Sequence, residues 1–261
     1  MRRLARSLRE LRIRWPMAPS ALAVVMREVI RRNRVHDGVI YLQVTRGVAP
    51  RNHAFPPDSV RPGVVCTARA VNRNDTEQTA SEGIAVITTP DNRWERVDIK
   101  TISLLPNVLA KQKAKEAGAT EAWFVDQAGY VTEGASSNAW IVTAEGVLVT
   151  RPTDTGILSG ITRHVVLDLL RREGVPFEER SFAVGEALAA REAFISSAGN
   201  LVMPVTRIDG KTIGSGKPGA LSLKLRRLFF TQADESPLRW SPGAIAHQPN
   251  LSDKEGAMHF R

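Results

Sequence analysis

Three short segments in the second half of the chain contain residues that could do chemistry together. Lys100 lies in VDIKTI, Glu133 in VTEGASSN, and a helix start at Gly160-Ile161-Thr162 lies in ILSGITR. A lysine in a cleft can form a Schiff base once desolvation lowers its pKa. A buried carboxylate can keep a cofactor's pyridine nitrogen protonated, and the free N–H groups of a helix start favour a phosphate. Each segment alone has an ordinary structural explanation, but the three together favour a catalytic site.

The elements around these segments alternate between strands and helices. The apolar alternation in RWERVDIKTI predicts a strand from which Lys100 projects. We expect further strands at IAVITT, AWFVD, NAWIVT, VLVT, AFISS and LVMPVTRI, and helices from about Asn107 to Ala117, from Ile161 to Glu173 and ending near Phe230. The turn Asp209-Gly210 predicts a hairpin. This pattern is typical of a mixed α/β domain.

The first part of the chain predicts a smaller domain. Two arginine-rich segments with apolar stripes, separated by Pro16 and Pro19, favour two helices, and strands are expected at about 39–45 and 64–70. The polar stretch VNRNDTEQTASEG is typical of a hinge between domains. We therefore expect a small domain over 1–74, a large domain over 75–230, and a disordered tail over 231–261.

Length, charge and cysteine content narrow the class of protein. The 261 residues carry a formal net charge of +9, and the first 35 contain ten Arg against two Glu. A solvated helix face explains this excess better than a nucleic-acid or membrane surface. No apolar run approaches the roughly 20 residues of a membrane span, and no secretory signal is present. The single cysteine, Cys66, suits a reducing compartment, so we expect a soluble cytoplasmic protein.

Several other short motifs resemble known functional sites but lack the neighbouring residues or elements that those sites need. GKT at 210–212 lacks the P-loop glycine five residues earlier, and GSGKPG at 214–219 lacks the strand and helix of a dinucleotide fingerprint. EGASSN contains neither a nucleophile elbow nor SxxK. The five histidines show no ligand spacing, so we expect no metal site.

Taken in order, these segments resemble the fold-type IV pyridoxal-phosphate (PLP) aminotransferases, over roughly residues 1–230. The resemblance implies the α/β (α+β) fold of that family, with PLP as cofactor. It implies that Lys100 is the Schiff-base lysine, which moves a proton, and that Glu133 pairs with the pyridine nitrogen. By the same resemblance, Leu158 packs on the ring, and the phosphate is bound by a set of four residues: Arg3, Ile161, Thr162 and Ser197.

The segment YLQVTRGVAPRNHAFP is similar to the D-amino-acid transaminase signature within the family. Arg51 and His53 are two residues apart, so on an extended segment both side chains point to the same side and can bind one carboxylate. The resemblance assigns them this substrate-binding role, although an exposed polar loop is the ordinary alternative. It implies transfer of the amino group of D-alanine to 2-oxoglutarate, giving pyruvate and D-glutamate, by a homodimer with no nucleic-acid or membrane partner.

Two departures from the family leave alternatives open. Relatives have a few dozen residues ahead of the Arg3 segment, so we expect the small domain to be incomplete here. Ala198 stands where relatives often place a phosphate-binding threonine. The alternatives are branched-chain transamination, aminodeoxychorismate lyase chemistry, an inactive truncated paralogue, and a basic nucleic-acid-binding protein, which strongly salt-dependent DNA binding would support.

Overall fold

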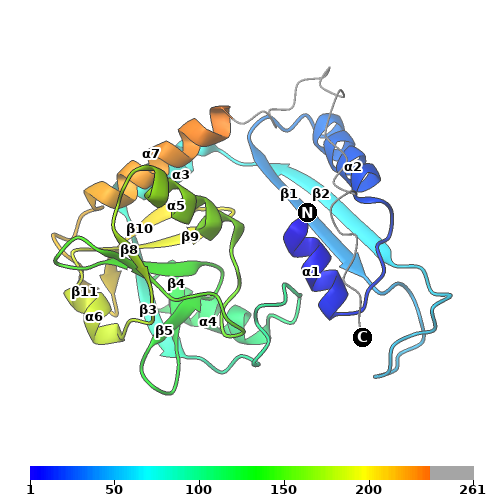
Figure 1. Ribbon diagram of the computed structural model, residues 1–261, viewed down its shortest axis with the longest axis horizontal. Helices are drawn as coiled ribbons and strands as arrows, with labels where there is room; N and C mark the ends of the chain where they lie inside the picture. The colour runs from blue at the N-terminus through cyan, green and yellow to red at the C-terminus, as the bar shows by residue number, and fades with distance from the viewer. Residues whose placement is uncertain (236–261) are drawn as a thin grey trace, which may run out of the picture.

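The computed structural model describes residues 1–235, which form a small and a large unit (Figure 1). The small unit consists of α1 Arg2–Glu10, α2 Pro19–Arg32, β1 Gly38–Thr45 and β2 Gly63–Ala70, and its two strands pair antiparallel. These elements confirm the two helices and two strands predicted for this part of the chain. Leu8 and Leu22 are buried, whereas most arginines of the two helices are exposed. The apolar stripes therefore face inward and the positive charge faces solvent.

The large unit is built on a nine-stranded mixed sheet. Its strands follow the order β5-β4-β3-β10-β9-β6-β7-β8, and β11 pairs with β10. Their bounds are β3 Ile84–Pro90, β4 Glu121–Val125, β5 Val131–Gly134, β6 Asn138–Val142, β7 Leu148–Thr150, β8 Phe177–Glu179, β9 Glu192–Ser197, β10 Leu201–Ile208 and β11 Lys211–Thr212. The helices packed with this sheet are α4 Leu105–Glu116, α5 Ile161–Arg172, α6 Val184–Ala189 and α7 Ala220–Glu235. The mixed α/β class is confirmed. The strands predicted at IAVITT, AWFVD, NAWIVT, VLVT, AFISS and LVMPVTRI are present and lie close to their expected bounds.

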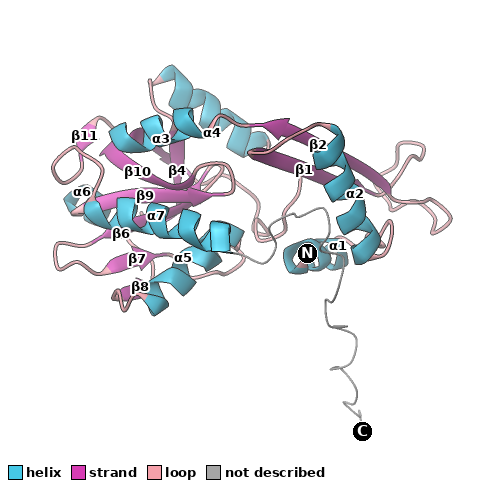
Figure 2. Cartoon of the chain, turned by 90° about the horizontal axis from the view of Figure 1, so that it is seen from above, coloured by secondary structure: helices cyan, strands magenta, loops and turns pink. Residues whose placement is uncertain are grey.

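Both faces of this sheet are buried. Along β6, Ala139 and Ile141 belong to the apolar cluster on one face, and Trp140 and Val142 belong to the cluster on the other. Helices α5 and α7 lie side by side over the second face (Figure 2). Successive side chains of a strand point to opposite faces, so a strand covered on both sides is apolar throughout. This explains why NAWIV is a continuous apolar run after its first residue.

The polar stretch expected to be a hinge contains a helix, α3 Arg73–Glu82. The sequence did not predict this helix because it carries almost no apolar signal: Ala80 is its only buried residue. The Asn72 side chain accepts a hydrogen bond from the Asn74 N–H at 3.0 Å and caps the helix start. The predicted domain boundary near Asn74 falls within the first turn of this helix.

The segment around Lys100 is not a strand either. Residues 91–104, between β3 and α4, are irregular, so the strand predicted for RWERVDIKTI was wrong. The alternation of that sequence does not reflect a pleated strand, because Asp98 is buried beside helix α1 and is held there by ion pairs. Tertiary contacts with the small unit therefore set the backbone of this segment.

Helix α7 closes the described part of the chain. The Glu192 carboxylate accepts hydrogen bonds from the backbone N–H groups of Leu221 at 3.1 Å and Ser222 at 3.0 Å, which fixes the helix start to β9. The helix continues to Glu235, so residues 231–235, predicted to be disordered, are helical. The rest of the predicted tail, 236–261, lies outside the described residues. Within residues 1–235, no helix has the length and apolar content needed to cross a membrane.

Candidate active site

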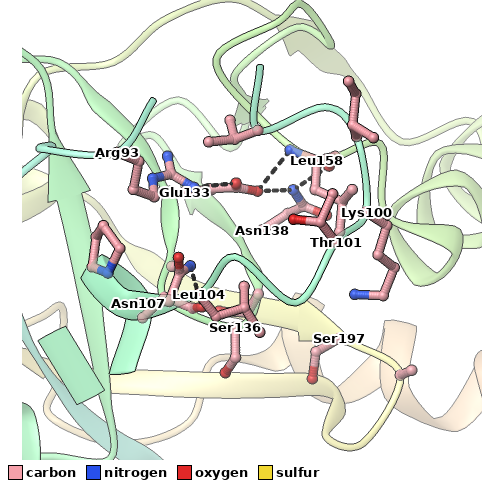
Figure 3. Close-up of a pocket in the computed structure, with 18 of the residues that line it drawn as sticks. Arg93, Lys100, Thr101, Leu104, Asn107, Glu133, Ser136, Asn138, Leu158 and Ser197 are labelled. Carbon is pink, nitrogen blue, oxygen red and sulfur yellow. Dashed lines mark hydrogen bonds and ion pairs between the residues drawn. The ribbon is translucent and has the colours of Figure 1, made fainter. Parts of the chain in front are cut away.

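A cavity of about 750 Å³ opens in the large unit (Figure 3), and Arg3 of helix α1 contributes to its lining. Its walls come from α1, the irregular segment 91–104, β5, the start of α5 and the hairpin between β9 and β10. The lining includes every residue predicted to bind the cofactor, namely Arg3, Lys100, Glu133, Leu158, Ile161, Thr162 and Ser197. The fold thus brings together seven residues from distant parts of the sequence.

The Lys100 side chain lies on one side of this cavity, across from Glu133 (Figure 3). Its backbone N–H donates a hydrogen bond to Ser7 Oγ on α1 at 3.2 Å. The open cavity leaves the side chain accessible, but the surrounding walls partly desolvate it and Arg3 repels its charge, and together these effects lower the pKa of Lys100. The nearby Glu133 opposes that shift. A lysine with a lowered pKa has more of the unprotonated amine that a Schiff-base reaction needs.

Glu133, on β5, is buried and accepts hydrogen bonds from three donors. Arg93 Nη1 lies 2.5 Å from Oε1, while Asn138 Nδ2 at 3.0 Å and the Leu158 N–H at 3.1 Å both contact Oε2. Burial raises the pKa of Glu133 to about 7, although Arg93 and the Leu158 N–H oppose the shift. Such a carboxylate has a fixed orientation and changes charge near neutral pH.

Arg93 orients the Glu133 carboxylate through their ion pair. Its guanidinium is almost completely buried, lies 2.7 Å from the Asp91 carboxylate, and stacks 4.4 Å from the Phe124 ring centroid. It therefore bridges the buried Glu133 carboxylate and the partly buried Asp91 carboxylate, which would otherwise lack a counter-charge. The sequence offered no signal for this role, nor for that of Asn138, because both partners are set by the fold.

The helix start predicted to bind phosphate faces the same cavity. Gly160 is the N-cap of α5, and a Cβ at this position would come within 2.1 Å of Asn138 Oδ1, so only glycine fits. Thr162 is buried in the first turn, and Arg3 reaches Ser159 O from α1 with a long contact of 3.4 Å. Free backbone donors, a hydroxyl and a guanidinium at a helix N-terminus form a suitable environment for a phosphate.

Helix α1 is clamped to the lysine segment by a group of charged residues. Arg6 pairs with the Asp98 carboxylate and donates to Asp98 O at 3.0 Å, and Arg96 Nε lies 3.0 Å from Asp98 Oδ1. Arg96 also contacts Glu10 of α1 at 2.7 Å. Burial raises the pKa of Asp98, but Arg96 and Arg6 outweigh it and leave that pKa below its usual value. These ion pairs hold the segment that carries Lys100 against the helix that carries Arg3. The sequence patterns did not predict them.

Arg51 and His53 lie outside this cavity. Both are exposed in the loop that joins β1 to β2, at the end of the small unit away from the large sheet (Figure 2). The base of the loop is anchored, because Arg46 stacks 3.5 Å from the Phe55 ring centroid and donates to Arg12 O at 3.3 Å. Within one chain, the structure therefore does not bring the predicted substrate-binding pair to Lys100.

Comparison with known proteins identifies the family. The sequence profile described as amino-transferase class IV matches residues 1–208. The chain belongs to the class IV aminotransferases. Among curated relatives of this aminotransferase, the D-alanine aminotransferase of Bacillus licheniformis is 43% identical over 220 residues, which cover 84% of this chain and 76% of the relative. That of Staphylococcus epidermidis strain ATCC 12228 is 39% identical over 227 residues, covering 87% and 79%.

Solved structures of branched-chain enzymes share the fold of this aminotransferase. The Escherichia coli branched-chain amino acid aminotransferase has a TM-score of 0.82 at 24% identity, covering 92% of this chain and 80% of its own. The branched-chain aminotransferase of the archaeon Thermoproteus uzoniensis, solved with norvaline, has a TM-score of 0.75 at 26% identity, covering 88% and 76%. Class IV aminotransferases use PLP, and these comparisons confirm the predicted fold and family.

Proposed function

We propose that this aminotransferase uses PLP to transfer the amino group of D-amino acids to 2-oxo acids, with D-alanine and 2-oxoglutarate giving pyruvate and D-glutamate. The observation that carries this proposal is that Lys100 and Glu133 face one cavity, the first with a lowered pKa and the second oriented by three donors. The choice of D-alanine is supported by the curated relatives at 39–43% identity that bear this activity in their names.

The residues around the cavity fit PLP at each of its functional groups. Lys100 Nζ would hold the aldehyde carbon covalently, and Glu133 would pair with the pyridine nitrogen. Leu158 would pack on the ring. The N–H groups of Ile161 and Thr162 would bind the phosphate together with two side chains, those of Arg3 and Ser197. The N–H donors and Arg3 thus suit the negative phosphate at one end of the cofactor, and the Glu133 carboxylate suits the protonated pyridine nitrogen.

PLP, when bound, withdraws electrons from the Cα atom of the amino acid attached to it. The Glu133 carboxylate, which Arg93 and Asn138 hold in place, would keep the pyridine nitrogen protonated. Lys100 Nζ, whose pKa is lowered by desolvation and by Arg3, would take up the Cα proton and deliver it to the C4′ carbon of the cofactor. The walls of the cavity orient both groups before the substrate arrives.

An absorbance titration tests this function directly. We expect PLP added to the purified full-length chain to produce a new band from protein-bound cofactor. D-alanine should change that band and release pyruvate, and 2-oxoglutarate should then restore it with formation of D-glutamate. L-leucine should leave the band unchanged.

Each other outcome identifies an alternative. A response to L-leucine but not to D-alanine would replace the proposal with branched-chain transamination. A band that no amino donor changes would indicate cofactor binding without turnover. The lack of any new band would overturn the proposed function for this chain.

We further propose that the enzyme works as a homodimer in which Arg51 and His53 bind the substrate carboxylate in the partner's cavity. Their exposure and their distance from the cavity of their own chain support this arrangement. Apolar side chains are also exposed beside the cavity: Ile102 at 67%, Leu105 at 69% and Val108 at 60%. An exposed apolar patch of this kind is typical of a protein–protein interface.

Mixed dimers test whether the site is shared. We expect Arg51→Ala to raise the KM for D-alanine by at least about ten-fold, because a charged hydrogen bond is lost, and Lys100→Ala to be inactive. Refolding Lys100→Ala together with the double variant Arg51→Ala/His53→Ala should restore normal KM in part of the sites. Each mixed dimer then contains one site with both functional parts.

The matched control mixes Lys100→Ala with Glu133→Gln, two changes within the cavity of one chain. That mixture should regain no activity, because neither site of the mixed dimer is complete. If the Arg51/His53 mixture forms dimers but no sites recover the normal KM for D-alanine, the shared site is wrong.

We also place the enzyme in the cytoplasm. Cys66 is the single cysteine of the chain, so the fold relies on no intrachain disulfide. Partial burial raises the pKa of the Cys66 thiol and disfavours the reactive thiolate. A fold that relies on no intrachain disulfide suits a reducing compartment.

A further inference from the structure

Arg226 is a buried arginine that reaches from helix α7 to the edge of the cavity. Its side chain is only 2% exposed, and its Nη1 donates to two backbone carbonyls, Asn200 O at 2.8 Å and Val202 O at 2.7 Å. Its Nη2 lies 2.9 Å from Glu77 Oε1 on α3. A buried charge with this many partners holds several elements together, since each partner would otherwise lose its counterpart.

The two carbonyls that Arg226 binds flank an unfavourable backbone conformation. Leu201 has a φ of +56°, in the left-handed region that a branched L side chain rarely adopts. Such a conformation persists only when the surrounding structure fixes it. Because one nitrogen of Arg226 bonds the residues before and after Leu201, it fixes the backbone on both sides of that residue.

This backbone belongs to the hairpin between β9 and β10, which forms part of the cavity wall. Ser197, Ala198, Gly199 and Asn200 all line the cavity. Ser197 Oγ accepts a hydrogen bond from the Asn200 N–H at 3.1 Å, so its own hydroxyl hydrogen remains free to donate. Ser197 lines the cavity (Figure 3), and Ala198 next to it has no hydroxyl.

We propose that Arg226 is a positioning residue that fixes the 197–201 turn and thereby aims the Ser197 hydroxyl at the phosphate of PLP. The inference rests on the proposed function, because the ligand of the turn is the cofactor assigned there. The path runs from Arg226 to Asn200 O, and from the Asn200 N–H to Ser197 Oγ. Arg226 itself does not line the cavity, so it acts on the cofactor only through this turn.

Glu77 gives the arrangement its second anchor. Its carboxylate is 45% exposed, whereas the guanidinium it binds is buried, so the pair lies at the boundary between core and solvent. Arg226 Nη2 also lies 3.4 Å from Thr76 O. The same guanidinium thus connects the cavity turn to α3, the helix that follows the small unit.

The test compares PLP affinity in four variants of the full-length chain. Arg226→Met should raise the dissociation constant of PLP by at least about ten-fold, the size expected for the loss of one hydrogen bond from the Ser197 hydroxyl to the charged phosphate, while kcat at saturating PLP stays close to that of the wild type. Arg226→Lys should have an intermediate effect. Arg227→Met, which changes an exposed arginine on the same helix, should bind PLP like the wild type. Adding Leu201→Gly to Arg226→Met should restore part of the affinity, because glycine adopts a positive φ without strain.

Hydrogen exchange of the cofactor-free chain provides a second measurement. The amides of residues 198–202 should exchange faster in Arg226→Met than in the wild type or Arg227→Met. If Arg226→Met fails to fold, the exchange rates of residues 198–202 are compared between the wild type, Arg226→Lys and Glu77→Gln instead.

The outcomes separate this proposal from the proposed function. A wild-type chain that binds no PLP would overturn the function, and the exchange rates would still show whether Arg226 holds the turn. Unchanged affinity and exchange in folded Arg226→Met would overturn the role of Arg226. Lowered affinity without rescue by Leu201→Gly and without faster exchange would also overturn it, because the effect would not pass through the turn.

Discussion

Replacement of Lys100 by alanine is expected to lower the rate of D-alanine transamination by at least about 10³-fold, since one side chain both attaches the cofactor and moves the proton. The band of protein-bound PLP should change as well, because noncovalent contacts alone would then hold the cofactor. Stopped-flow absorbance with D-alanine measures the loss, and a small external amine should restore part of the rate. Rescue is expected because the cavity is open at Lys100 and can admit such an amine.

The matched control for this variant is Lys113→Ala on α4, an exposed lysine away from the cavity lining. It should retain the wild-type rate and spectrum. If Lys100→Ala kept normal turnover, another group would have to move the proton and the assignment of Lys100 would be wrong. Loss of activity without any change in the band would leave Lys100 outside the covalent step.

Glu133→Gln is expected to lower kcat by about 10²- to 10³-fold, the usual cost of removing one preorganised electrostatic partner. A neutral amide cannot keep the pyridine nitrogen protonated. Without cofactor, burial raises the pKa of Glu133 to about 7, so the wild-type chain should bind PLP more tightly as the pH rises through that value and the carboxylate becomes charged. A pH profile of PLP affinity for both proteins should show this rise in the wild type and its loss in the variant.

Asp126→Asn is the control for the loss of a paired carboxylate. Asp126 contacts Arg151 at 3.1 Å and accepts hydrogen bonds in the β4–β5 turn, outside the cavity. It should retain both the rate and the shape of the profile. A rise through pH 7 that survives in Glu133→Gln would show that another group titrates, and Lys100 would then be the first residue to test.

The grouping of Lys100, Glu133 and the α5 start around one cavity could be predicted because each belongs to a short segment with its own chemistry, whereas Arg3, Leu158 and Ser197 were expected there only from the family resemblance. Lys100 and Glu133 have side chains suited to their tasks, and the α5 start is marked by Gly160, whose missing Cβ leaves room for Asn138. Arg93 could not be predicted. Its two carboxylate partners come from β5 and from the end of β3, and one arginine among several charged neighbours has no distinctive spacing.

The errors in the predicted fold have the same origin. Helix α3 has one buried residue, so its apolar pattern gives no periodicity, and it depends instead on contacts such as Glu77 with Arg226. The segment before Lys100 alternates like a strand, but Asp98 is drawn to α1 by Arg6. Both structures depend on partners more than 90 residues away along the chain, which local propensity cannot detect.

The position of β3 in the sheet has a consequence for how the protein is made. β3 is the first strand of the large unit to leave the ribosome, yet one of its two neighbours is β10, whose residues 201–208 are synthesised last among the main strands. Until then no strand pairing joins the β3-β4-β5 group to the β6-β7-β8-β9 group, and each has an unpaired edge where β10 will lie. Glu133 belongs to the first group and Ser197 to the second. A nascent chain therefore has no complete cofactor site before β10 joins the two halves, and its exposed strand edges need protection during that interval.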